Sequence, residues 1–109
     1  MLRKIPARAW LARAVRAADR LMKLVPGVSH LVHMPSHIYV RLGRWDDAAR
    51  SNHAAMLADD AYRAAYPNPG FYAMYMAHNG HFYAFSAFMQ GRSAAAITHA
   101  RRMVAEIPD

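Results

Sequence analysis

Five of the seven histidines in this 109-residue sequence form two short clusters with matching spacing. His30, His33 and His37 lie close together, and His78 and His81 repeat the spacing of the first two further along the chain. On a helix with about 3.6 residues per turn, positions i, i+3 and i+7 lie on one side. Neutral imidazoles suit Zn, Cu, Ni or Fe, and a set of three leaves one coordination position open. The two clusters therefore predict one shared transition-metal site made by these five histidines.

For each single histidine, the alternative is a structural role. A partly buried imidazole can bond to the backbone or to tyrosine and bind no metal. Two clusters in matching register favour a functional site, whereas His53 and His99 lack such matching and are left out of the predicted site. The sequence contains no cysteine, so only histidine and carboxylate side chains remain as metal ligands.

No other motif in the sequence indicates catalysis. It contains no glycine-rich phosphate loop, no nucleophile elbow and no paired carboxylates. The aromatic residues between Phe71 and Phe88 could stack on nucleic-acid bases, but their helical spacing beside Met74 and Met76 favours a hydrophobic core. An enzyme built on this chain would therefore be a metalloenzyme, with water or substrate on the open metal position.

Helices must position the two histidine clusters, because the apolar periodicity is about 3.6 residues throughout and no strand pattern is found. We predict an all-α protein whose five helices span about 7–25, 31–43, 46–64, 70–90 and 93–107. Proline is tolerated only in the first turn of a helix, so the second helix starts or bends near Pro35. In the fourth helix, Gly80 costs about 1 kcal/mol relative to alanine, which indicates close packing or a function.

A helix–turn–helix unit occurs twice in the sequence. The turn at Gly43-Arg44 has its counterpart at Gly91-Arg92, with the same offset along the chain as separates His30 from His78. Pro26 and Asp60 stand at the expected breaks between units, and their separation matches the tetratricopeptide period. We therefore predict one helical-repeat domain over 1–109. It consists of the second half of a repeat (1–26), one repeat (27–60) and a last repeat (61–109) with an insertion near 60–71.

Two segments carry a resemblance to a known family: His30-x-x-His33-Met34-Pro35-x-His37-Ile38-Tyr39 and His78-Asn79-x-His81-Phe82. Together with the turn at Gly43-Arg44-Trp45, they resemble a largely uncharacterised group of bacterial tetratricopeptide-repeat proteins. The resemblance covers about residues 29–103 and implies an α-solenoid of stacked helical hairpins. In that fold the first helix of each hairpin lines the inner side, so both histidine clusters would face one shared space. The resemblance also implies a longer protein, of which this chain is a piece.

The chain is basic, and its charge is unevenly distributed. The net charge is +7, and half of the 14 lysines and arginines lie in the first 23 positions. Their helical spacing opposite apolar residues predicts an amphipathic helix with a solvated face, with an anionic-surface or transit-peptide role as the alternative. This uneven distribution disfavours a nucleic-acid partner. We find neither a signal peptide nor an apolar run of about eighteen residues that would span a membrane. The sequence does not indicate a cellular compartment.

Three functions remain open on the sequence alone. The first is a histidine-lined metal-binding repeat protein, with a metalloenzyme of unassigned reaction as its extension. The second is a repeat scaffold that binds a peptide or protein without metal. The third, supported by charge alone, is a basic binder of nucleic acid or of an anionic surface. Uncapped repeat ends additionally predict self-association.

Overall fold

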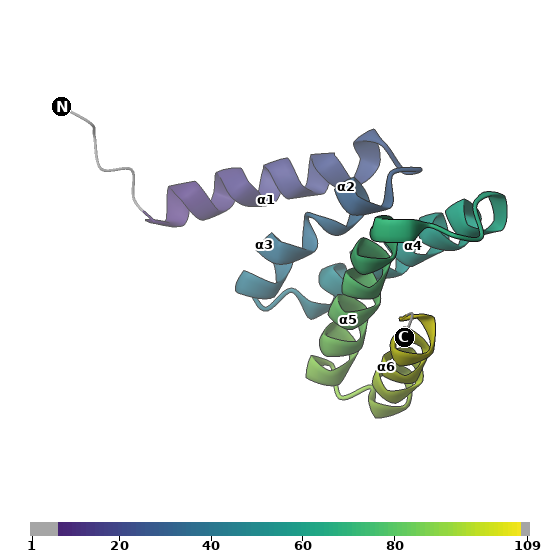
Figure 1. Ribbon diagram of the computed structural model, residues 1–109. Coiled ribbons are helices and arrows are strands. Elements are labelled where there is room, and N and C mark those ends of the chain that lie inside the picture. Colours follow the sequence, from purple (N-terminus) through teal and green to yellow (C-terminus); the bar gives the residue numbers. More distant parts are fainter. Residues whose placement is uncertain (1–6, 108–109) are drawn as a thin grey trace.

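The computed structural model describes residues 7–107, which are mainly helical and contain no strand (Figure 1). The elements are α1 (Ala7–Leu24), α2 (Ser29–His33), α3 (Ser36–Arg41), α4 (Trp45–Ala65), the 3-10 helix η1 (Gly70–Tyr72), α5 (Ala73–Met89) and α6 (Ser93–Glu106). The predicted all-α class and the five predicted helices are confirmed for this range, with the second helix divided into α2 and α3. Residues 1–6 and 108–109, which belong to the predicted terminal units, lie outside the described residues.

Pro35 divides the second predicted helix. It has no N–H, so the regular helical ladder is interrupted, and the N–H of His37 donates to the carbonyl of Met34 (3.2 Å). The ladder resumes where the N–H of Tyr39 donates to the carbonyl of Pro35 (3.1 Å). The expected start or bend at this proline is confirmed. As a result, His33 ends α2, whereas His37 lies in the first turn of α3.

The turns after α3 and after α5 have the same backbone structure. Gly43 and Gly91 adopt φ values of 69° and 73°, a left-handed conformation in which a side chain would be strained. In both turns, the N–H of the following residue donates to the carbonyl five positions back, at 2.9 Å. This bonding pattern is the Schellman motif that ends many helices. The predicted turns are therefore present at both equivalent positions.

Helices that are close in the chain pack on one another. α2 and α3 contact α4, α4 contacts α5, α5 contacts α6, and α1 lies against α2 and α3 (Figure 1). Small buried side chains at Ala48, Ala55 and Ala87 allow the helix backbones to approach closely. One core cluster joins Ala49 and Met56 of α4 to residues of α5. The fold thus places α2 and α5 against the same central helix, and these two helices also contact each other.

The segment near 60–71, where the sequence predicts an insertion, has two structural parts. Residues 60–65 form the last part of α4, which continues through Ala65. The rest, from Tyr66 to Pro69, connects α4 to η1, where the left-handed Gly70 (φ 60°) leads into the short 3-10 helix. This connection brings Phe71 and Tyr72 to the start of α5.

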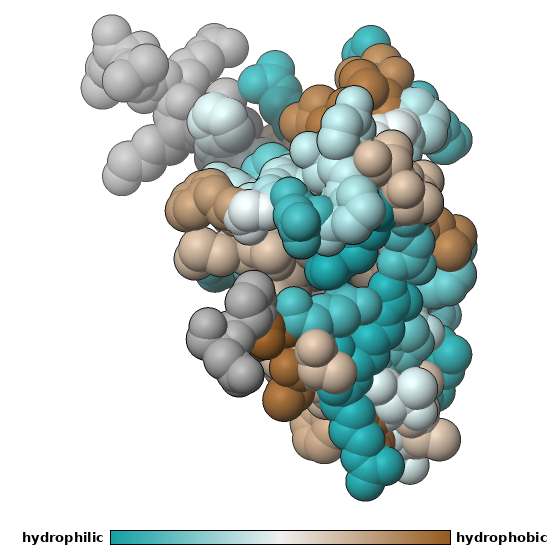
Figure 2. Space-filling model, turned by 45° about the vertical axis from the view of Figure 1, so that its right-hand side comes forward, coloured by the Kyte–Doolittle hydropathy of each residue, from teal (hydrophilic) through white to brown (hydrophobic). Residues whose placement is uncertain are grey.

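Several large hydrophobic side chains are exposed at the surface. One face shows hydrophobic residues interspersed among hydrophilic ones (Figure 2). The large hydrophobic side chains that are most exposed include Phe71 (74%), Phe88 (68%) and Met74 (65%). None of the helices in residues 7–107 is long and apolar enough to cross a membrane.

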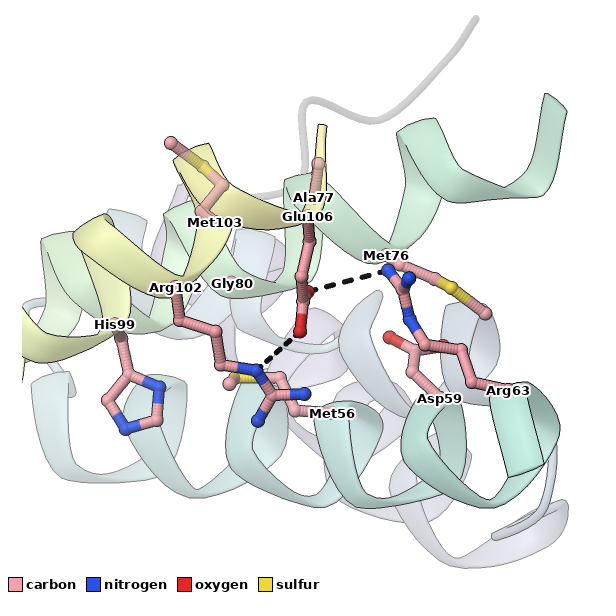
Figure 3. A pocket seen from close by; sticks show the side chains of 10 residues that line it. All are labelled: Met56, Asp59, Arg63, Met76, Ala77, Gly80, His99, Arg102, Met103 and Glu106. Carbon is pink, nitrogen blue, oxygen red and sulfur yellow. Dashed lines mark hydrogen bonds and ion pairs between the residues drawn. The ribbon is translucent and has the colours of Figure 1, made fainter. Parts of the chain in front are cut away.

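Ion pairs attach α6 to α4 around a small cavity between α4, α5 and α6 (Figure 3). Glu106 accepts hydrogen bonds from Arg63 of α4 (3.4 Å) and from Arg102 (2.7 Å), and Arg102 also contacts Asp60. Such partly exposed pairs contribute about 0–1 kcal/mol each, so these ion pairs hold α6 against α4 only weakly.

A buried polar pair connects α4 to α5. The amide Nδ2–H of Asn79 donates to Oδ2 of Asp59 (2.8 Å), while Oδ1 of each residue is buried without a partner. Burial raises the pKa of Asp59, and the polar side chains of Ser29 and Asn79 oppose this shift. One added proton on Asp59 would satisfy both unpaired oxygens, because the acid could donate to the amide oxygen while accepting from its N–H.

Replacement of Asp59 by asparagine is expected to remove a pH dependence of stability. Because folding raises the pKa of Asp59, its stabilising contribution is fully present below the usual aspartate pKa and is lost as the pH rises through the folded-state value. Asp59→Asn keeps the acceptor and adds a donor, so its free energy of unfolding should exceed that of the parent at pH 8 by about 1 kcal/mol. Urea unfolding between pH 4 and pH 8 measures this difference.

Asp60→Asn is the matched control, because Asp60 is partly exposed and pairs with Arg102. It should not remove the pH dependence. If the parent and Asp59→Asn lose stability in parallel as the pH rises, the buried acid does not control this junction.

Gly80→Ala is expected to stabilise the protein. A Cβ atom at this position would meet Cβ of Met103 at 3.9 Å, an ordinary contact, so the packing of α5 does not require glycine. The gain in helix propensity is about 1 kcal/mol, which calorimetry would detect as a higher Tm. Gly43→Ala is the control and should lower the Tm, because that glycine is left-handed. A lower Tm for Gly80→Ala would show that the packing at this position requires glycine.

Candidate metal centre

Three histidines from three helices meet at one place in the structure. His33 of α2, His37 of α3 and His78 of α5 each offer a ring nitrogen, and these three atoms lie within 4.8 Å of one another. The Nε2 atoms of His33 and His37 are 3.0 Å apart. The ring of His78 lies edge-on to that of His33, with centroids separated by 4.7 Å. The structure thus brings together histidines from both clusters.

The two clusters are related by a constant distance along the chain, but this relation does not predict which histidines meet. It makes His81 the equivalent of His33, but the residue that approaches His33 is His78, one helical turn earlier on α5. His81 is exposed and is not part of the group of three. Its contribution to a metal site stays a prediction.

His30 lies beside the group without belonging to it. Its ring stacks on that of His33 (centroid distance 6.0 Å) and meets the ring of Tyr75 edge-on (5.0 Å). Its Nδ1 atom is buried and has no hydrogen-bond partner. The predicted ligand role of His30 is likewise untested, and its position next to His33 suits contact with a ligand of the site.

Asn52 of α4 orients the imidazole of His33. The Nδ1–H of His33 donates to Oδ1 of Asn52 (2.6 Å), and both side chains are buried. The amide Nδ2–H of Asn52 donates to the carbonyl of Ala48 (2.8 Å), which fixes the amide so that its oxygen faces the histidine. The Nε2 lone pair of His33 therefore points toward His37 and His78. Histidines that bind metals commonly donate their other N–H to an oxygen in this way.

The electrostatic environment keeps these imidazoles neutral. Burial lowers the pKa of His33 to about 4, opposed by its bond to Asn52 and reinforced by the neighbouring histidines. Burial also lowers the pKa of His37 and of His78. Near pH 7 the ring nitrogens therefore keep the lone pairs that a metal ligand requires.

Phe82 of α5 closes one side of the group. Its ring lies 4.6 Å from that of His37 and 5.0 Å from those of His33 and His78, measured between centroids. This apolar side chain excludes water from part of the site and leaves the rest open, because His37 is exposed and His78 is only partly buried. The arrangement is a partly enclosed group of three neutral imidazoles, which is compatible with metal binding.

Asn52 is the residue of the candidate site that sequence reasoning missed. A signal for it exists in the predicted helix 46–64, where it lies in the apolar stripe formed by Ala48, Ala55 and Met56. A polar side chain in a buried stripe requires a partner. The identity of that partner depends on how α2 packs on α4, which the periodicity of either helix alone does not determine.

Comparisons with known proteins assign no function to this geometry. No family model, curated protein or solved structure matches the chain. A functional conclusion therefore depends on the arrangement of its own residues.

We expect Asn52 and His33 to be energetically coupled. Asn52→Leu leaves the buried Nδ1–H of His33 with only the more distant hydroxyl of Ser36 (3.5 Å) and should destabilise the protein by about 1–3 kcal/mol. In the double variant Asn52→Leu/His33→Leu both partners are removed, so its loss should be smaller than the sum of the two single losses. Denaturant unfolding of the four proteins without added metal measures the coupling. Additive losses would show that the hydrogen bond does not contribute.

Proposed function

We propose that this chain is a tetratricopeptide-like helical-repeat protein that binds a divalent transition-metal ion through His33, His37 and His78. The observation that carries the proposal is the convergence of three imidazole nitrogens within 4.8 Å. Each comes from a different helix, and one is oriented by a buried hydrogen bond to Asn52. A chance group of surface histidines would lack such an orienting partner.

The distances fit a metal after a small adjustment. Zn–N bonds of about 2.0–2.1 Å at tetrahedral angles separate ligand nitrogens by about 3.3 Å. The Nε2 atoms of His33 and His37 are already 3.0 Å apart. His33 is fixed by its partner, whereas His37 and His78 have more exposed side chains that can rotate. One rigid ligand and two adjustable ligands would thus accommodate the ion.

The ligand type restricts which metals suit the site. Three neutral imidazoles without a thiolate or carboxylate favour Zn, Cu, Ni or Fe over Mg or Ca, which prefer oxygen. Three protein ligands also leave a coordination position for another molecule. This open position is compatible with storage, sensing or catalysis, and the proposal is metal binding itself.

The tetratricopeptide-like part of the proposal is supported by the turns and the packing. Gly43 and Gly91 end equivalent helices with the same hydrogen bonds, and each helix packs on its neighbours in the chain. A solenoid places equivalent inner helices side by side, as would be needed for α2 and α5 to share a ligand. Contact between these two helices agrees with that arrangement.

Calorimetric titration of the untagged protein with Zn²⁺, Cu²⁺ and Ni²⁺ tests the proposal. Alanine substitution of His33, His37 or His78 should weaken binding by about 100-fold or more, because each removes one of three ligands. Asn52→Leu should weaken binding about 10–100-fold while all ligands stay in place. Pairs of substitutions within the group should not have additive effects.

Two further variants serve as controls. His53→Ala lies outside both clusters and should leave affinity unchanged. His81→Ala distinguishes the three-residue site from the larger set predicted from sequence, since only the larger set requires it. If the parent binds no metal more tightly than its His33→Ala variant, the metal site is refuted and a peptide-binding scaffold becomes the better proposal.

A further inference from the structure

An open groove lies directly beside the three histidines. It has a volume of about 520 Å³, within the size range of small-molecule pockets. Its walls come from α2, η1 and α5, and are formed by His30, Phe71, Met74, Tyr75 and His78. Three of these five side chains are apolar or aromatic, and the other two are histidines. None is acidic.

The groove and the proposed metal site are continuous. His78 belongs to both, as one of the three converging histidines and as part of the groove wall. His30 also joins the groove to the histidine group, because its ring stacks on that of His33 and meets that of Tyr75 in the groove wall. A molecule lying in the groove would therefore reach the coordination position that three protein ligands leave open.

The positive charge of a bound metal ion determines which chemical group of such a molecule faces the histidines. Three neutral imidazoles leave the full charge of a divalent ion uncompensated, and neither they nor the groove walls supply a carboxylate. The partly enclosed side beneath Phe82 strengthens the attraction for an anion, because the local dielectric is low there. The ion thus favours an anionic oxygen ligand.

The rest of the groove favours an apolar body. Phe71 and Met74 are exposed by 74% and 65%, and the ring of Phe71 meets that of Tyr75 edge-on at 5.9 Å. An exposed aromatic surface that borders a polar cluster is typical of ligand sites. A flat or branched hydrocarbon group would cover these side chains and remove them from water.

We propose that this groove binds a small monocarboxylate with an aromatic or branched apolar body, whose carboxylate ligates the metal held by His33, His37 and His78. This inference deepens the proposed function and depends on it. One carboxylate oxygen binds the metal. The other lies against the imidazole of His30, which lines the groove and stacks on His33.

The probes are phenylacetate and acetate, titrated into the protein loaded with Co²⁺, whose visible spectrum reports on its ligands. Both carboxylates should change the spectrum, and phenylacetate should bind at least 10-fold more tightly than acetate. The metal-free protein should bind phenylacetate at least 10-fold more weakly than the loaded protein. Dissociation constants come from calorimetry, which is independent of any catalytic activity.

Phe71→Ala and Phe88→Ala form a matched pair, since both phenylalanines are highly exposed but only Phe71 borders the groove. Phe71→Ala should weaken phenylacetate binding several-fold without changing the affinity for acetate or Co²⁺, and Phe88→Ala should change none of the three. His30→Ala should weaken both carboxylates while Co²⁺ still binds.

The outcomes separate this inference from the proposed function. If Co²⁺ does not bind to the parent, both are overturned. If Co²⁺ binds but acetate and phenylacetate have equal affinities, or if the two phenylalanine variants behave alike, the groove inference is wrong and the metal site stands. Equal affinity of phenylacetate for the loaded and metal-free proteins would overturn the ligation of its carboxylate.

Discussion

The arrangement of the candidate site depends on one buried hydrogen bond, from Nδ1–H of His33 to Oδ1 of Asn52. It joins α2 to α4, selects the tautomer of the histidine and directs Nε2 toward His37 and His78. Neither partner reaches water, so an alternative position for either side chain would leave a buried polar group unpaired. This constraint makes His33 the fixed reference around which the two more exposed histidines are arranged.

Pro35 has a related effect on the backbone. A continuous helix through residues 29–41 would place His33 and His37 one turn apart on the same axis. The interruption at the proline lets α3 take its own direction while the two Nε2 atoms stay 3.0 Å apart. A residue that is unfavourable in a long helix thus helps position two of the converging nitrogens, and Phe82 then covers them from α5.

The sequence predicted what depends on local spacing and missed what depends on packing. Helices follow from the apolar period, the break follows from Pro35, and the two turns follow from Gly43 and Gly91, because each is determined within a few residues. The two histidine clusters were expected to meet because of their common offset. That His78 and not His81 approaches His33 depends on the rotation of α5 about its axis, and the role of Asn52 depends on how α2 lies across α4. Neither property is encoded in one helix alone.

His78 lies far along the chain from His33 and His37, and this separation has a thermodynamic consequence. A bound ion would link His33 to His78 and so close a long loop, which includes all of α4. Closing such a loop in an unfolded chain has an entropic cost that grows with the logarithm of its length, so the folded form would be the strongly binding one. Metal concentration would then set how cooperatively the two helical hairpins unfold, and the ion would act as a reversible cross-link in a chain without cysteine.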